Sequence, residues 1–253
     1  MVAADVFAME RRQKSGYRSI IKVFELFCGS CARHLREVVI RRADLRTVRY
    51  DYMRFGCLEY AAQGLACVKG DSMKWIIASD IHGSKQYCEK LLERVNEEKA
   101  DAIFLLGDIL YHGPRNALPG EYQPMAVAEM LNAKKDMITC VRGNCDAEVD
   151  QMVLEFPIMA DYALMSYGNR RIFFTHGHLF DKTNPPMLKE GDVMVYGHFH
   201  VQDADVKNGI IFINPGSVSI PKNGSRHGYI LFKDGVFLFK DVLTGETFNR
   251  YSL

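Results

Sequence analysis

Between residues 75 and 200, five short apolar runs each end beside a glycine and a carboxylate, amide or imidazole side chain. The first run begins at Trp75 and ends in Asp80-Ile81-His82-Gly83. Runs of this length and composition are typical of buried strands in α/β sheets. Because chemistry in an open α/β sheet gathers at the carboxyl ends of its strands, we expect the five ends to form one site. The other four ends are Gly107-Asp108, Gly143-Asn144, His176-Gly177 and Gly197-His198-Phe199-His200.

Expected helices separate the first three runs, and this order predicts a parallel sheet. Ser84 suits the N-cap of a helix that extends to Glu98, with Cys88 on its apolar face. Pro124 suits the first turn of a second helix. A chain that alternates strand and helix in this way joins parallel strands by right-handed crossovers. The second and third strands are expected at residues 102–106 and 137–141.

Antiparallel hairpins replace the helices in the second half of the chain. Asn208-Gly209, for example, is a two-residue turn signal between two candidate strands. Two mixed sheets packed face to face, with helices outside them, accommodate both halves in one mixed α/β domain. The hairpin strands are expected at 162–166 with 171–175, at 204–207 with 210–213 and at 229–232 with 236–240, and a single strand at 193–196.

The composition limits which binding partners and which cellular compartment we expect for this protein. The 253 residues carry a formal net charge of +1, so no overall field favours nucleic acid or a membrane surface. No apolar run in the sequence approaches the length that spans a bilayer. The cysteines number seven, an odd count, and no segment reads as a secretion signal, which together indicate a reducing compartment. We therefore expect a cytoplasmic protein.

Residues 1–72 differ from the rest of the chain in charge and pattern. They contain 13 Lys and Arg against 8 Asp and Glu, whereas residues 73–253 contain 19 against 23. Met73 stands immediately before the first clear strand, and codons for Lys69-Gly70-Asp71 can spell a purine-rich ribosome-binding sequence. We therefore expect residues 1–72 to be an N-terminal extension, upstream sequence read in frame rather than a native domain, and residues 73–253 to be the functional domain.

Two features of this extension allow other interpretations. Its Cys28-Gly29-Ser30-Cys31 pair is typical of a redox dithiol, or of half a zinc site completed by Cys57 and Cys67. The ten-residue separation of those two cysteines argues against zinc, and the absence of a strand pattern before the pair argues against a thioredoxin-like unit. A weak apolar pattern is also spaced for one helix face, and its residues are Ile20, Ile21, Phe24 and Phe27.

Six of the eight histidines lie in or beside the strand ends, together with two aspartates and an asparagine. Core packing does not explain such a concentration of polar side chains. Oxygen and nitrogen ligands without thiolate suit Mn²⁺, Fe²⁺, Zn²⁺ or Co²⁺, and the number of good ligands suits two ions that share a carboxylate. Residues two apart in an extended segment face the same side, so Asp80 can converge with His82. The histidines are His82, His112, His176, His178, His198 and His200.

The order of these motifs resembles the signature of the calcineurin-like metallophosphoesterase superfamily over nearly all of residues 73–253. The details are similar to the bacterial YfcE-type phosphodiesterases. The resemblance implies a metallophosphoesterase domain with a four-layer α-β-β-α sandwich built on two mixed β-sheets. The segments that carry this finer resemblance are His112-Gly113-Pro114-Arg115-Asn116, Arg142-Gly143-Asn144-Cys145-Asp146, Thr175-His176-Gly177-His178 and Asn214-Pro215-Gly216-Ser217.

The same resemblance implies a dinuclear metal site. Mn²⁺ is the expected ion, with zinc, iron, cobalt and nickel as alternatives. The two ions would lower the pKa of a bridging water, orient the phosphate and stabilise the attacking and leaving oxygens. Carried over by motif, one ion would be held by Asp80, His82 and His200, the other by Asn144, His176 and His198, with Asp108 bridging them.

Cys145 departs from the family pattern, because many members have a histidine there that is thought to protonate the leaving group or contact the phosphate. A neutral thiol is a poor acid near pH 7, so the chemistry should favour diesters with good leaving groups over alkyl monoesters. His112 is the nearest alternative acid, although a loop histidine bonded to backbone explains it equally well. We expect the substrate to contact Asn144, Cys145 and Arg115. For Arg115, the simpler interpretation is a loop side chain that is only solvated.

These patterns predict a metal-dependent phosphoric diester hydrolase that cleaves a small phosphodiester by attack of a metal-bridging hydroxide. A scaffold or interaction module is the alternative, because a retromer subunit of the same superfamily serves as a scaffold. A phosphomonoesterase is a third possibility. No basic stripe or aromatic platform indicates a polynucleotide, and no membrane partner is expected. The resemblance suggests a homo-oligomer without specifying its size.

Overall fold

The computed structural model describes residues 4–12, 18–26 and 73–253. The chain divides into two compact units, Met1–Leu58 and Glu59–Leu253. The expected boundary after residue 72 falls among residues that are not described and stays a prediction. The four cysteines of the extension, which bear on the redox and zinc interpretations, also lie outside the described residues.

In the first unit, β1 (Ala4–Arg12) pairs antiparallel with β2 (Arg18–Leu26). The helix expected over Ile20, Ile21 and Phe24 is therefore wrong, because these residues lie in a strand. Valine, isoleucine and phenylalanine favour an extended chain, and the pairing with β1 overrides a weak helical spacing.

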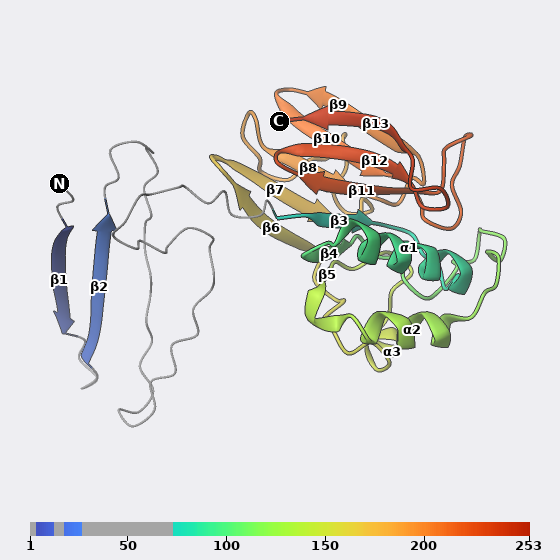
Figure 1. Cartoon of the computed structure of the whole chain (residues 1–253), viewed down its shortest axis with the longest axis horizontal. Helices are drawn as coiled ribbons and strands as arrows, with labels where there is room; N and C mark the ends of the chain where they lie inside the picture. Colours follow the sequence, from blue (N-terminus) through green and yellow to red (C-terminus); the bar gives the residue numbers. More distant parts are fainter. Residues whose placement is uncertain (1–3, 13–17, 27–72) are drawn as a thin grey trace, which may run out of the picture. The chain divides into compact units, whose positions relative to one another are not determined.

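A six-stranded sheet forms one layer of the second unit (Figure 1). Its order is β13-β12-β11-β3-β4-β5, in which β3, β4 and β5 are parallel and β11 runs antiparallel to β3. The predicted β-α-β-α-β order and parallel pairing are thus confirmed. The strands are β3 (Trp75–Ala78), β4 (Ala102–Leu105), β5 (Ile138–Cys140), β11 (Gly228–Lys233), β12 (Val236–Asp241) and β13 (Thr247–Ser252).

A five-stranded sheet forms the facing layer, in the order β6-β7-β8-β10-β9. The pairs β7–β8 and β8–β10 are parallel, whereas the hairpins β6–β7 and β9–β10 are antiparallel, as their turn signals predict. Both sheets are therefore mixed. The strands are β6 (Tyr162–Tyr167), β7 (Arg170–Thr175), β8 (Val193–Tyr196), β9 (Gln202–Lys207) and β10 (Ile210–Pro215).

Helices α1 (Lys85–Glu98) and α2 (Pro124–Asn132) begin where their sequence signals place them. Pro124 opens α2, and Ser84 stands at the N-cap of α1. The capping hydrogen bond expected of Ser84 is absent, because its hydroxyl donates to the Gly120 carbonyl at 2.6 Å. A one-turn helix, α3 (Glu148–Gln151), and a 3-10 turn over Lys135–Met137 complete the described helices, none of which is both long and apolar enough to cross a membrane.

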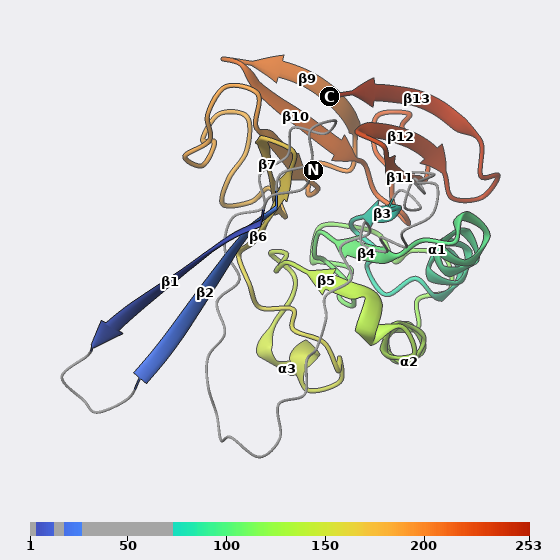
Figure 2. The ribbon, with the colours of Figure 1, turned by 60° about the vertical axis from the view of Figure 1, so that its left-hand side comes forward.

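Alternation along β3 divides the core between two faces of the six-stranded sheet. Ile76 and Ala78 pack with residues of α1 and α2, whereas Trp75 and Ile77 pack with the five-stranded sheet, for example against Phe174. Strands β3 and β4 therefore lie between the helices and the second sheet (Figure 2). Burial on both faces explains why these strands read as continuous apolar runs.

A loop covers part of the outer face of the five-stranded sheet. Phe180 and Leu188, from the segment 177–192, pack on the apolar side chains of this face, which include Met194 and Phe212. Within that segment the structure describes no helix. The expected fold class, a mixed α/β domain with two mixed sheets, is confirmed. Beside Phe180, this loop rather than a helix forms the layer outside the five-stranded sheet.

Strand register determines where the site forms. Ala78, Leu105 and Cys140 lie in one row across β3, β4 and β5, so these strands end together. Thr175 and Tyr196 end β7 and β8 in register on the facing sheet. The polar motifs that follow these five ends are therefore delivered to the same edge of the two sheets.

Candidate metal centre

Five of the predicted ligands share an uncommon backbone conformation. Their φ angles, between 51° and 67°, lie in the left-handed region that residues other than glycine seldom adopt. Such strain persists only where surrounding structure enforces it, and it concentrates at functional sites. The Ser217 and Ser219 hydroxyls, for example, both donate to the Asp80 carbonyl, at 2.8 and 3.0 Å. The five residues are Asp80, His82, Asp108, His198 and His200.

Asp80, His82 and His200 converge in a first buried group. The Nε2 atoms of the two histidines lie 3.3 Å apart. Asp80 Oδ1 lies 3.6 Å from His82 Nε2 and 3.3 Å from His200 Nε2. Both imidazoles are held by their other nitrogen, because His82 Nδ1 contacts the Tyr111 carbonyl and His200 Nδ1 contacts the Ile220 carbonyl, each at 2.8 Å.

This first group is suited to a cation. A backbone carbonyl only accepts hydrogen bonds, so both Nδ1 atoms must be the protonated ones and each neutral ring turns a lone pair inward at Nε2. Asp80 Oδ1 is buried and has no hydrogen-bond partner. Three electron-pair donors thus meet in a space shielded from solvent, where an unpaired polar atom is costly. A histidine whose second nitrogen binds a carbonyl is the usual arrangement of metal-ligating imidazole.

His176 is the centre of a second group. Its Nδ1 donates to the Leu106 carbonyl at 2.6 Å, which leaves the Nε2 lone pair facing the site. That Nε2 lies 3.0 Å from Asn144 Oδ1 and 3.2 Å from His198 Nδ1. His176 is fully buried, whereas Asn144 is exposed and His198 half-buried, so this group opens to solvent on the Asn144 side.

Asp108 stands between the two groups. Its Oδ2 lies 3.7 Å from His82 Nε2 in the first group and 3.5 Å from His176 Nε2 in the second. Its other oxygen, Oδ1, accepts the Cys145 backbone N–H at 2.8 Å, which fixes the carboxylate plane. The seven residues predicted as ligands therefore lie in one connected cluster.

Burial and mutual attraction set the charges of this cluster. Burial raises the pKa of Asp80, but contacts with the His200 and His82 imidazoles outweigh it and hold that pKa well below its usual range. Burial lowers the pKa of His176, whereas the Asp108 and Asp80 carboxylates raise it more, to about 9. The two carboxylates stay ionised at neutral pH and attract protons or metal cations into the site.

Asp146 is a functional residue that the motif pattern did not single out. Its buried carboxylate accepts three backbone N–H groups, from Asp108 at 2.9 Å, Ile109 at 2.9 Å and Gly143 at 2.7 Å. These bonds hold the turns that present Asp108 and Asn144. Its place two residues after Asn144 was the only available signal.

Gly143 is required because the Asp108 loop presses against it. A Cβ atom added there would lie 2.1 Å from Asp108 Oδ1 and 2.3 Å from the Asp108 backbone nitrogen. Gly143 therefore lets the loops that follow β4 and β5 approach closely enough for Asp108 and Asn144 to share a site.

The predicted catalytic and substrate-binding residues fall at the rim. Cys145 Sγ lies close to the ligand atoms of His82 and Asp108. The Asn144 side-chain amide donates a hydrogen bond to this sulfur at 3.2 Å. Burial raises the pKa of the Cys145 thiol, and the Asp108 carboxylate adds to this, so the group is a neutral thiol. His112 is half-buried between the rings of Tyr111 and Tyr122, and its Nδ1 is buried without a hydrogen-bond partner.

The remaining rim residue, Arg115, is exposed on the loop after β4. That loop lies close to the centre, because a Cβ atom at Gly113 would lie 3.1 Å from Cys145 Sγ. The described contacts do not bring the Arg115 or His112 side chain to the carboxylates of the cluster.

Comparison with known proteins identifies the family. The calcineurin-like phosphoesterase superfamily domain matches residues 73–234. The chain belongs to this superfamily. Its resemblance by motif is thereby confirmed, and the chain is a hydrolase that acts on phosphoesters in a family that uses divalent metals.

Within the superfamily, the chain is similar to two bacterial proteins. It is 49% identical over 181 residues to phosphodiesterase YfcE of Escherichia coli strain K12, which covers 72% of this chain and 95% of the relative. It is 28% identical over 166 residues to the probable metallophosphoesterase YsnB of Bacillus subtilis strain 168, covering 63% and 83%. The solved structure of YfcE, a phosphoesterase from E. coli, matches with a TM-score of 0.69 at 44% identity, covering 71% and 99%.

Proposed function

We propose that this calcineurin-like phosphoesterase is a dinuclear metal-dependent phosphodiesterase that hydrolyses a small phosphodiester. One observation carries the proposal. A single carboxylate oxygen, Asp108 Oδ2, lies within 3.7 Å of ligand nitrogens in two different groups of electron-pair donors. A shared carboxylate between two donor groups is the arrangement that two-metal hydrolases use.

The donor set supports the assignment of ligands and metal. Imidazole, carboxylate and amide donors suit Mn²⁺, with zinc, iron, cobalt and nickel as alternatives. When bound, two such cations would lower the pKa of a water molecule and withdraw charge from the phosphate. One ion would be held by Asp80, His82 and His200, the other by Asn144, His176 and His198, and both by Asp108.

The chain's own contribution is rigid positioning. His82, His176 and His200 each have one ring nitrogen fixed on a backbone carbonyl, so their ligand nitrogens need not reorganise when the site is filled. The opening beside Asn144 and Cys145 gives the phosphate its approach. Cys145 would contact the phosphate as a neutral hydrogen-bond partner.

Leaving-group chemistry favours a diester. Cys145 is a neutral thiol, and the described contacts do not bring the His112 side chain to the carboxylates of the cluster. Without a well-placed acid, the reaction depends on a leaving alkoxide or phenoxide of low basicity. The 49% identity to a relative named a phosphodiesterase supports the same choice.

The odd number of cysteines supports a cytoplasmic location.

The proposal is tested by hydrolysis of bis(p-nitrophenyl) phosphate with and without added Mn²⁺. We expect activity to rise with Mn²⁺ and to fall at least 100-fold in Asp108→Ala. Asp136→Ala, which removes an exposed carboxylate from the 3-10 turn, is the matched control and should keep the activity. Folded protein with two bound ions and no turnover of any diester would instead support a scaffold, and a large preference for monoesters would support a phosphomonoesterase.

A further inference from the structure

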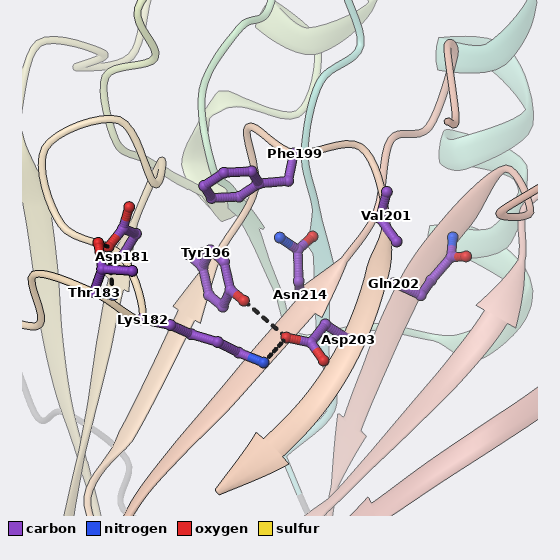
Figure 3. Close-up of a pocket in the computed structure, with 9 residues that line it drawn as sticks. All are labelled: Asp181, Lys182, Thr183, Tyr196, Phe199, Val201, Gln202, Asp203 and Asn214. Atoms are coloured by element: carbon purple, nitrogen blue, oxygen red, sulfur yellow. Dashed lines mark hydrogen bonds and ion pairs between the residues drawn. The ribbon is translucent and has the colours of Figure 1, made fainter. Parts of the chain in front are cut away.

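A cavity of about 370 Å³ lies beside the metal centre, on the outer face of the five-stranded sheet (Figure 3). Its size falls in the range of small-molecule sites. The walls come from the end of β8, the start of β9, the end of β10 and the loop after β7. The residues that line it are Asp181, Lys182, Thr183, Tyr196, Phe199, Val201, Gln202, Asp203 and Asn214.

Phe199 connects this cavity to the metal centre. It is the single residue between His198 and His200, and its ring centroid lies 5.2 Å from that of His198. Its side chain leans over the cavity above Tyr196 and Asn214, as Figure 3 shows. Although aromatic, Phe199 is 45% exposed. An exposed aromatic ring at the mouth of a cavity is a candidate for stacking on a ligand.

The polar groups of the cavity wall are already paired with one another. The Tyr196 hydroxyl donates to Asp203 Oδ2 at 2.9 Å, and Lys182 forms ion pairs with Asp203 and Asp205. The Asn214 amide donates to the Gly197 carbonyl at 2.9 Å. A ligand therefore meets mainly the surfaces of Phe199 and Val201 rather than free hydrogen-bonding groups.

The charges of the lining exclude a second anionic group. Asp181 and Asp203 outnumber Lys182, the one cation among the lining residues. A further phosphate would be repelled, so an extended polynucleotide fits poorly. A flat, uncharged group fits both the aromatic surface and the charge.

We propose that this cavity binds a planar, uncharged aromatic group on one ester arm of the substrate, stacked on Phe199. The inference rests on the proposed phosphodiesterase function, because the metal centre must hold the phosphate from which the arm extends. Phe199 then determines specificity, selecting diesters that carry an aryl group or a nucleobase over those with small alkyl arms.

Calorimetric binding of benzylphosphonate and methylphosphonate to the Mn²⁺-loaded protein tests this inference. The two ligands share a head group and differ in the aromatic arm. We expect benzylphosphonate to bind wild type roughly 5- to 150-fold more tightly, the range that one stacked aromatic contributes. Phe199→Ala should remove most of this difference and leave the affinity for methylphosphonate within about twofold. Phe199→Trp should keep the difference.

Leu179→Ala is the matched control, because Leu179 is an exposed apolar residue outside the cavity lining. It should preserve the aromatic preference, and the metal content of all three variants should equal that of wild type. Equal binding of both phosphonates to wild type, or an aromatic preference that survives Phe199→Ala, would overturn the inference alone. Failure of both phosphonates to bind would overturn the proposed function and this inference with it.

Discussion

His82 and His200 bring their Nε2 atoms to 3.3 Å from each other although neither ring, when neutral, has a proton to share there. Both rings donate their Nδ1–H to backbone carbonyls. Two facing lone pairs beside the buried Asp80 carboxylate repel one another unless a cation lies among them. The fold enforces this arrangement through left-handed backbone at Asp80, His82 and His200. Of the ten described non-glycine residues with such backbone, five are residues that a metal would hold.

Gly143→Ala should disable the centre although it replaces none of the proposed ligands. The new methyl would lie 2.1 Å from Asp108 Oδ1, so the Asp108 loop must move. We expect at least a 100-fold loss of kcat/KM and a stability cost of about 1–3 kcal/mol, as for other overpacked sites. Metal content and urea unfolding, measured on the same preparation, check both effects.

Gly168→Ala provides the control for that substitution. Gly168 lies in the β6–β7 turn with a φ of 60°, and nothing lies within 4 Å of its added Cβ. It should cost about 1 kcal/mol from backbone strain alone and leave activity unchanged. Normal activity in Gly143→Ala would show that Asp108 does not need its present position.

Asp146→Ala should destabilise the domain and weaken metal binding together. The substitution strands three buried N–H groups, on Asp108, Ile109 and Gly143. At about 1–3 kcal/mol for each unpaired group, the unfolding free energy should fall by about 3 kcal/mol or more. Asp146→Asn, which keeps one acceptor oxygen, should lose less. Metal affinity equal to wild type in folded Asp146→Ala would refute a positioning role.

Asp192 should make stability sensitive to acid. Burial raises its pKa, but N–H groups of Arg171 and Lys189 and the Arg171 guanidinium bind the carboxylate and lower that pKa below its usual value. A lowered pKa contributes stability that is fully present above the unfolded-state value of about 3.9 and is lost as pH falls through the folded-state value.

Urea unfolding of Asp192→Asn between pH 7 and pH 2 checks this expectation. The variant should be less stable than wild type by about 1–3 kcal/mol at pH 7, and the difference should shrink below about pH 4. Asp136→Asn, at an exposed position, should stay within about 0.5 kcal/mol of wild type. A difference between Asp192→Asn and wild type that does not change with pH would contradict the assignment.

Cys145→His should shift preference toward substrates with poor leaving groups. An imidazole titrates near neutral pH and can protonate an alkoxide, whereas the neutral thiol of Cys145 cannot. We expect the rate on an alkyl phosphomonoester to rise about tenfold relative to the rate on an aryl diester, toward the lower end of general-acid effects. Cys145→Ser should leave the ratio near wild type, and an unchanged ratio in Cys145→His would refute the argument from the leaving group.

The sequence was most informative where strands end. The apolar runs before Asp80, Asp108 and Asn144 predicted both a parallel sheet and the edge at which ligands gather, because burial on two faces and strand register leave few alternatives. Ser84 was placed correctly, but the partner of its hydroxyl, the Gly120 carbonyl, depends on a loop 36 residues away. Local signals do not specify such long-range bonds.

The remaining features depend on tertiary packing. Asp146 and Phe199 stand inside recognised motifs, yet their roles follow from three converging N–H groups and from a cavity formed by separate loops. Ile20 and Phe24 lie in a strand, which shows that strand pairing overrides a weak helical spacing of apolar residues. The left-handed backbone at His198 and His200 likewise has no local sequence signal.

The most direct test of the central claim is the diesterase activity of metal-free protein titrated with Mn²⁺, with bound metal counted at each point. Activity on bis(p-nitrophenyl) phosphate should rise until two ions are bound per chain and then stop increasing. Activity that is complete at one ion per chain, or that persists in the metal-free protein, would contradict a dinuclear phosphodiesterase.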